Sequence, residues 1–86
     1  MNWDEISWIL RGRLKRKVIQ SLDKPKTATI LSKELNTHRS TISDILNQME
    51  KKKLVICLDP NQPYNRFYKI TKKGMQILNK IKEANL

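Results

Sequence analysis

Apolar residues recur at helical spacing through the first 22 residues of the chain and predict a helix there. The stripe repeats every fourth position, through Ile6, Leu10, Leu14, Val18 and Leu22. Gly12 lies inside this pattern, where a glycine costs a helix about 1 kcal/mol relative to Ala. We therefore expect a break near Gly12, with a short leading helix over 3–10 and a main first helix over 13–22.

A turn and a short helix follow. Pro25 cannot continue a helix and disfavours helical angles at the residue before it, so we expect a turn over 23–26. Thr27 is a favourable N-cap for a helix over 28–35. The inner side of that helix would comprise Ile30, Leu31 and Leu35. Asn36 tolerates the left-handed angles that end a helix, which predicts a sharp corner there.

The pattern continues with a longer helix, a pair of strands and a last helix. The longer helix runs over 39–52, and its apolar face comprises Ile42, Ile45, Leu46 and Met49. Residues 54–58 and 66–70 are rich in β-forming side chains, and the polar, proline-containing segment between them predicts a loop. The last helix runs over 72–84, with Thr71 as its N-cap. Its inner face is expected to comprise Met75 and Leu78, with Ile77 beside them and Ile81 as a further candidate.

These elements predict one mainly helical α+β domain over residues 1–86. Between Thr27 and Gly74 the order is helix, tight turn, second helix and two-stranded hairpin. A helix-turn-helix followed by a hairpin is a shape that suits a DNA duplex, because the second helix can enter the major groove.

The charge of the chain narrows the choice of partner. There are 18 Lys plus Arg and 8 Asp plus Glu, a formal net charge of +10 that favours DNA, RNA or an anionic membrane surface. No apolar run approaches the ~20 residues of a spanning helix. The acidic start of the chain, over 1–5, also differs from a secretory signal. We therefore expect a cytoplasmic, nucleoid-associated protein with no membrane partner.

The sequence offers little reactive chemistry. Cys57 and His38 are the single cysteine and the single histidine, so we expect neither an internal disulfide nor a structural zinc site. There is no Ser-His-Asp set, carboxylate pair or glycine-rich phosphate loop in the sequence. We therefore expect no enzyme activity, no cofactor and no metal. Cys57 lies in an apolar strand, where a core position is expected rather than a redox sensor.

The outward side of the helix over 39–52 is the best candidate for a DNA-reading surface. Removing the apolar face leaves Arg39, Ser40, Ser43, Asp44 and Asn47 near its start. The major groove accepts one α-helix, and there Arg39 suits guanine and Asn47 suits adenine. Asp44 could accept a hydrogen bond from a cytosine amino group but would repel phosphates. The alternative is an ordinary polar helix start, where Ser and Asp are common.

From Thr27 to about Leu78 the sequence resembles winged helix-turn-helix transcription regulators of the ArsR and MarR type, small archaeal and bacterial repressor-like proteins. Three segments carry the resemblance in the order of the family: Leu35–Leu46, Met49–Val55 and Arg66–Gly74. The first looks like the turn and recognition helix, the second like the exit into the wing, and the third like the end of the wing. The resemblance implies a three-helix core, a two-stranded β wing and a C-terminal helix.

The resemblance also implies a site and a partner. The helix over about 39–52 would read the major groove of double-stranded DNA, and the wing over 59–66 would contact the backbone or the minor groove. The expected DNA-contacting residues are Thr37, His38, Arg39, Ser40, Thr41, Ser43, Asp44, Asn47, Gln62, Tyr64, Asn65 and Arg66. A homodimer through the C-terminal helix and the N-terminal helix with Trp3 and Trp8 is implied as well. Alternatively, both tryptophans belong to the ordinary core.

Four positions depart from the pattern of the family. Thr37 stands where an apolar residue usually fills the turn, and His38 stands where Ser or Thr usually caps the helix. Lys53 replaces a glycine that commonly takes a left-handed angle, which implies some backbone strain. Asp44 stands where a basic or neutral residue is commoner, so this departure concerns affinity rather than the fold.

Several functions stay open on the sequence alone. The leading hypothesis is a sequence-specific, duplex-DNA-binding transcription regulator. The alternatives are a winged-helix protein-interaction module in a transcription or replication assembly, and a non-specific or architectural nucleic-acid binder. RNA or single-strand binding would depend on base stacking by the aromatic residues of the wing. The charge of +10 argues against a purely protein-docking role.

Overall fold

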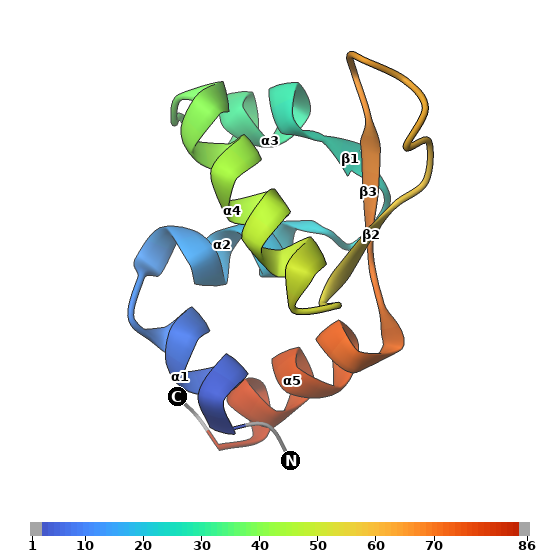
Figure 1. The fold of residues 1–86 in the computed structure, drawn as a ribbon. Helices are drawn as coiled ribbons and strands as arrows, with labels where there is room; N and C mark the ends of the chain where they lie inside the picture. Colours follow the sequence, from blue (N-terminus) through green and yellow to red (C-terminus); the bar gives the residue numbers. More distant parts are fainter. Residues whose placement is uncertain (1–2, 85–86) are drawn as a thin grey trace.

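The computed structural model describes residues 3–84, which form five helices and one three-stranded antiparallel sheet (Figure 1). In chain order the elements are α1 (Trp3–Leu10), α2 (Arg13–Ser21), β1 (Lys26–Thr27), α3 (Ala28–Glu34), α4 (Arg39–Lys51), β2 (Val55–Cys57), β3 (Phe67–Ile70) and α5 (Lys72–Glu83). The mainly helical α+β class and the winged helix-turn-helix arrangement are confirmed. The short third strand, β1, is an addition to the two-stranded wing that the sequence predicts.

The expected break at Gly12 is confirmed. Helix α1 ends at Leu10 and α2 begins at Arg13, with Gly12 between them in an extended conformation (φ −138°). The two halves of the apolar stripe therefore point into the core from two separate helices, which pack against each other. Figure 1 shows α1 beside α5, at the end of the molecule away from the β2–β3 loop.

Local capping rules determine the helix-turn-helix. The hydroxyl of Thr27 accepts a hydrogen bond from the backbone N–H of Ile30 at 3.1 Å, as expected for an N-cap. Asn36 adopts a left-handed conformation with φ 52°, which is also as expected. The chain then turns sharply, and α4 begins at Arg39. His38 holds the N-cap position of α4, but its side chain makes no capping hydrogen bond.

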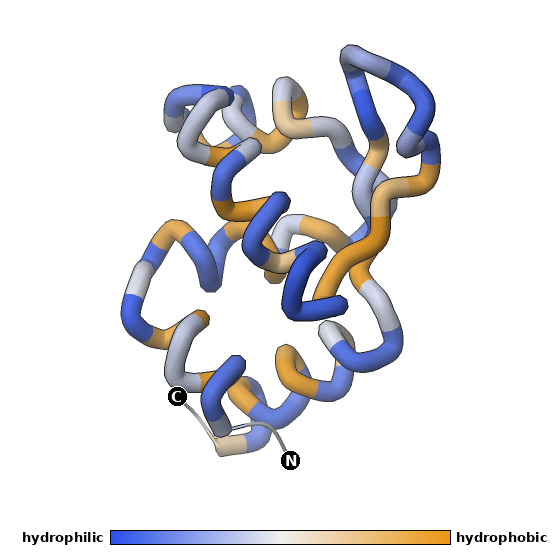
Figure 2. The backbone as a smooth tube through the Cα atoms, in the orientation of Figure 1, coloured by the Kyte–Doolittle hydropathy of each residue, from blue (hydrophilic) through white to orange (hydrophobic). Residues whose placement is uncertain are grey.

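The core is a single apolar cluster to which every helix contributes. Its most deeply buried members are Ile6, Ile9, Val18, Ile19, Leu31, Ile42, Leu46, Met49 and Leu54. All four residues of the expected apolar face of α4 are buried. In Figure 2 the apolar and hydrophilic segments alternate along α4, whereas the loop between β2 and β3 is hydrophilic over most of its length. This contrast leaves the loop free to face solvent or a polar partner.

Two inward-facing assignments are wrong. Ile30 in α3 is 38% exposed and Met75 in α5 is 52% exposed. In α5 the buried residues are Gly74, Ile77 and Ile81, which share one face at the i, i+3, i+7 spacing. Gly74 determines this face, because a Cβ atom there would collide with the backbone carbonyl of Leu54. Only a helix face with glycine at this position can approach Leu54 so closely, and this orientation of α5 leaves Met75 facing outward.

The sheet has β3 at its centre and the strand order β1–β3–β2. Ile56 pairs with Lys69 and Cys57 pairs with Tyr68, while β1 places Lys26 opposite Tyr68. The expectation that residue 26 belongs to a turn is therefore wrong. Lys26 is buried, and its amino group bonds to the carboxylates of Glu34 at 2.8 Å and Asp23 at 3.1 Å. These ion pairs allow a lysine in a strand that joins α3 to the wing.

The exit from α4 into β2 follows the expected left-handed turn. Lys53 has a φ of 64°, although it is not a glycine. Its carbonyl oxygen accepts a hydrogen bond from the hydroxyl of Thr71 at 2.7 Å. The hydroxyl of Thr71 also accepts from the backbone N–H of Gly74, so Thr71 caps α5 as expected. One threonine thus joins the start of α5 to the end of α4.

Candidate nucleic-acid interface

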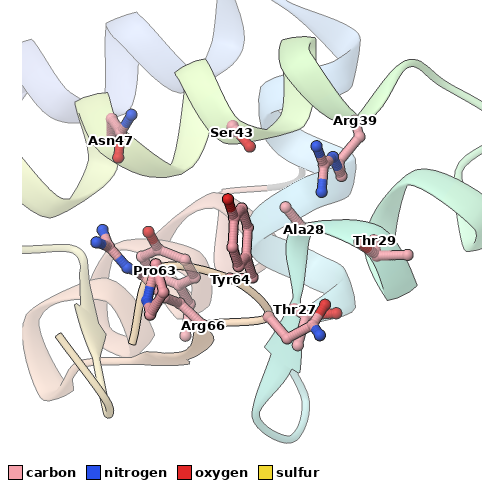
Figure 3. A pocket seen from close by; sticks show the side chains of 11 residues that line it. Thr27, Ala28, Thr29, Arg39, Ser43, Asn47, Pro63, Tyr64 and Arg66 are labelled. Carbon is pink, nitrogen blue, oxygen red and sulfur yellow. The ribbon is translucent and has the colours of Figure 1, made fainter. Parts of the chain in front are cut away.

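An open cleft of about 320 Å³ lies between α4 and the wing. One side is a row of polar side chains on α4, Arg39, Ser43 and Asn47, which are four residues apart and therefore lie along one helix face. The opposite side consists of Pro63–Arg66 in the β2–β3 loop. Figure 3 shows Tyr64 pointing across the cleft toward α4, between Arg39 and Arg66. The two sides of the cleft thus come from segments that are well separated in the sequence.

The apolar face of α4 determines which side of this helix faces outward. Because Ile42, Leu46 and Met49 are fully buried, the opposite side of the helix must face outward. That side carries Ser40, Asp44 and Asn47, all of which are exposed. The side chains that the sequence proposed as base readers therefore lie on an accessible helix face.

The wing loop has a defined shape because Asp59 organises it. The Asp59 carboxylate accepts a hydrogen bond from the backbone N–H of Phe67 at 2.8 Å, and Leu58 donates its N–H to the carbonyl of Phe67 at 2.9 Å. Farther along the loop, the guanidinium of Arg66 donates to the carbonyl of Gln62. Asp59 is thus a structural residue of the wing.

Six of the twelve predicted contact residues line this cleft. They are Arg39, Ser43, Asn47, Tyr64, Asn65 and Arg66. The other six lie outside its lining: Thr37, His38, Ser40, Thr41, Asp44 and Gln62. All of these are exposed except Thr37, which is half-buried and donates its hydroxyl to the carbonyl of Leu35 at 3.3 Å. Thr37 therefore stabilises the turn between α3 and α4. The other five residues surround the cleft and the start of α4.

The cleft also contains residues that are not among the twelve expected contacts. These are Thr27, Ala28, Thr29, Pro63 and Tyr68. The first three enter the lining because β1 pairs with β3 and so holds the start of α3 against the wing. No local signal marks a two-residue strand, so this approach was not predictable. Tyr68 is buried under the wing, whereas Tyr64 is 74% exposed at its tip.

The electrostatics of the cleft favour an anion. Its lining contains Arg39 and Arg66 and no Asp or Glu. Burial raises the pKa of the Tyr68 phenol, so this hydroxyl remains neutral at physiological pH. A pair of guanidinium groups on opposite sides, with neutral hydroxyl and amide groups between them, matches a phosphate backbone and the edges of bases.

The described residues supply no other site of recognised chemistry. Residues 3–84 bring together no three His, Cys, Asp or Glu side chains that could hold a metal ion. Cys57 is a buried free cysteine, which confirms the expected core position. In the same part of the chain, no helix is both long enough and apolar enough to cross a membrane.

The two tryptophans have different surroundings. Trp3 is 62% exposed, so the expectation that it could be ordinary core is wrong. Trp8 is half-buried, and its ring lies 4.4 Å from the amino group of Lys15 and 5.1 Å from that of Lys52. Trp8 is therefore covered by cations of this chain, whereas Trp3 remains accessible on α1. An open groove of about 610 Å³ runs between α1 and α5 on this end of the molecule.

Comparison with known proteins rests on structure, since no family model and no curated protein matches the sequence. A transcriptional regulator from Thermotoga maritima has a TM-score of 0.74 at 24% identity, over 92% of this chain and 61% of its own. A MarR family transcription regulator has a TM-score of 0.74 at 25% identity, over 86% of this chain and 51% of its own. A mutant of MepR from S. aureus, solved bound to an oligodeoxyribonucleotide, has a TM-score of 0.76 at 18% identity, over 94% of this chain and 63% of its own.

These likenesses confirm that the fold is that of winged-helix regulators of the MarR type. All three proteins are longer, and this chain spans between 51% and 63% of their length.

Proposed function

We propose that this protein is a sequence-specific, double-stranded-DNA-binding transcription regulator and that it carries out no chemistry on its target. The observation that carries this proposal is the cleft between α4 and the wing, in which two arginines and several neutral hydrogen-bonding groups are present without a carboxylate. The formal charge of +10 supplies the long-range attraction to a polyanion.

In the proposed complex α4 lies in the major groove. Arg39 then donates two hydrogen bonds to the O6 and N7 atoms of a guanine, and Asn47 pairs with an adenine. Ser43, between them on the same face, bonds to a base or a phosphate. Asp44 lies at the edge of this surface, where its carboxylate accepts from a cytosine amino group or reduces affinity for nearby phosphates.

The wing has a different role in the proposal. Tyr64 and Asn65 lie at its tip, and Arg66 follows them immediately before β3. Because α4 occupies the major groove in this complex, the wing would lie along the backbone or in the minor groove beside the site of α4. Contacts from the wing would then supply affinity that depends little on sequence.

We also infer that the protein pairs with a second copy through α1 and α5. The exposed Trp3 and the groove between these helices support this, since tryptophan is enriched at interface hot spots. A two-fold dimer would place two α4 helices about 34 Å apart, one turn of DNA. Its operator would then be palindromic. A cytoplasmic, nucleoid-associated location belongs to the same proposal.

Selection from a pool of random duplexes tests this function. The protein is incubated with the pool at low and at moderate salt, and the bound DNA is sequenced. We expect enrichment of one palindrome, with half-sites about one turn apart. Binding without enrichment would instead indicate an architectural role, and the absence of binding at low salt would overturn the proposal.

A further inference from the structure

The outer face of the sheet carries an exposed apolar patch. Ile56 and Leu58 are each 51% exposed, and Phe67 is 40% exposed. These three side chains share one face, because Ile56 pairs with Lys69 and the Leu58 N–H bonds to the Phe67 carbonyl on the neighbouring strand. Nothing within the described residues covers them.

A groove continues this patch toward α5. It has a volume of about 320 Å³ and lies between the end of α2, the end of β3 and α5. Its apolar lining includes Pro25, Ile70, Met75 and Leu78, and Met75 projects 52% of its surface to solvent. Lys69 belongs to both the groove and the sheet face, so the two form one surface, which we call the rear surface.

The rear surface is cationic at its edges. Lys24, Lys69 and Lys82 line the groove, and none of them forms a salt bridge within residues 3–84. Asp23 is the single carboxylate of the lining, and it is already paired with Lys26 at 3.1 Å. Apolar side chains surrounded by unpaired lysines are complementary to a partner that carries both apolar and acidic residues.

The exposed sheet face of the rear surface lies on the side of β3 away from the cleft, and the groove lies at the end of β3, beside α5. Side chains alternate along a strand, so Tyr68 points toward α4 and lines the cleft, while Phe67 and Lys69 point away from it. A duplex held between α4 and the wing would therefore leave the rear surface open. A second macromolecule could bind there without displacing the first.

We propose that the rear surface docks an acidic, apolar peptide segment of a partner protein. Leucine or phenylalanine side chains of the segment occupy the groove beside Met75 and the patch at Phe67. Its carboxylates pair with Lys24, Lys69 and Lys82. The length of the surface, from the start of the wing to α5, fits an extended or helical peptide better than a small molecule. This proposal does not depend on the function proposed for the cleft.

Fluorescence anisotropy with a defined probe tests the proposal. The probe is a fluorescein-labelled synthetic peptide of Leu, Phe, Asp and Glu, and the matched control peptide has Ser in place of Leu and Phe. We expect the apolar acidic peptide to bind at physiological salt and the Ser peptide to bind at least about tenfold more weakly, a difference of about 1.4 kcal/mol.

Protein variants locate the binding site. Lys69→Glu and Met75→Ser should each weaken binding of the apolar acidic peptide by about tenfold. Lys17→Glu is the matched control, because Lys17 is exposed on α2 outside the groove and the charge change is the same. Its effect should be less than about twofold, and excess duplex DNA should not displace the peptide.

Four results would overturn the proposal. Equal weakening by Lys17→Glu would show attraction by net charge alone, and equal binding of the Ser peptide would remove any role of the apolar groove. Displacement by duplex DNA would place the peptide in the cleft. Failure of the unaltered protein to bind the probe would leave the rear surface without the proposed partner. Thermal unfolding of each variant confirms that it is folded before its binding is compared.

Discussion

Lys73 on α5 donates a hydrogen bond to the carboxylate of Glu5 on α1 at 2.9 Å, and the same amino group bonds to the carbonyl of Lys52 at the end of α4 at 2.9 Å. One side chain therefore connects three helices, including two from opposite ends of the chain. The contact with Lys73 holds the pKa of Glu5 below its usual value of 4.5. A pH dependence of stability follows from this connection.

The ionised form of Glu5 should stabilise the fold. A carboxyl whose pKa is lower in the folded state contributes stability above pH 4.5, and this contribution is lost as the pH falls through the lower folded value. We expect Glu5→Gln to reduce the free energy of unfolding at pH 7 by at most about 1 kcal/mol, as for a partly exposed ion pair. Urea unfolding of both proteins between pH 7 and pH 3 measures this. The difference should shrink toward acid pH, and a constant difference would contradict the assigned role.

Arg39 and Arg66 should differ in what they contribute to DNA binding. Arg39→Ala should relax specificity at one base position, with a cost of ~1–3 kcal/mol on the preferred duplex. Arg66→Ala should weaken binding to all duplexes alike and reduce the slope of log affinity against log salt by about 1. Titrations of the selected duplex and of a scrambled duplex at several salt concentrations separate the two effects. Unchanged binding by both variants would show that α4 and the wing are wrongly placed on DNA.

Gly74→Ala should destabilise the protein through overpacking. The added methyl group would collide with the Leu54 carbonyl and would lie 2.7 Å from the side chain of Ile70. The expected loss in the free energy of unfolding is ~1–3 kcal/mol, measured by urea denaturation. Gly12→Ala is the matched control, because its nearest contact is a flexible lysine side chain at 3.4 Å. A loss in that control as large as the loss in Gly74→Ala would contradict the steric explanation.

Lys53→Gly should leave the fold intact and stabilise it slightly. A non-glycine residue at φ 64° carries strain of ~1–2 kcal/mol, which glycine would relieve. Glycine also makes the unfolded chain more flexible, and this offsets part of the gain in the free energy of unfolding. We expect a net gain of about 0.5 kcal/mol in urea unfolding. The same change at Lys51, which is helical, should instead cost about 0.5–1 kcal/mol. Destabilisation by Lys53→Gly would mean that its lysine side chain matters more than its backbone angle.

Trp3→Ser should shift the protein toward monomers. The exposed indole on α1 is the proposed anchor of the dimer, and its loss removes apolar area that only a second copy would bury. Sedimentation equilibrium over a range of concentrations measures the change. Tyr64→Ser removes an equally accessible aromatic side chain from the wing tip and should leave the association unchanged. Identical behaviour of Trp3→Ser and the unaltered protein would place the dimer contact elsewhere or exclude it.

Several local features of the structure could be predicted from the sequence. The break at Gly12, the caps at Thr27 and Thr71, and the left-handed angle at Asn36 all agree with the structure. Each depends on one residue and its near neighbours in the chain. The apolar face of α4 was readable for the same reason, since a regular helix converts spacing in sequence into position in space. The polar residues of α4 could therefore be identified from the sequence as its outward surface.

Tertiary contacts decided the rest. The two-residue strand β1 exists because β3 supplies its partners, and it buries Lys26 and brings the start of α3 into the cleft. The face of α5 depends on how closely Gly74 approaches Leu54, so spacing alone chose Met75 wrongly. In each case the local sequence is compatible with more than one arrangement. The choice among them is made by segments far apart in sequence, whose meeting cannot be inferred from local propensity.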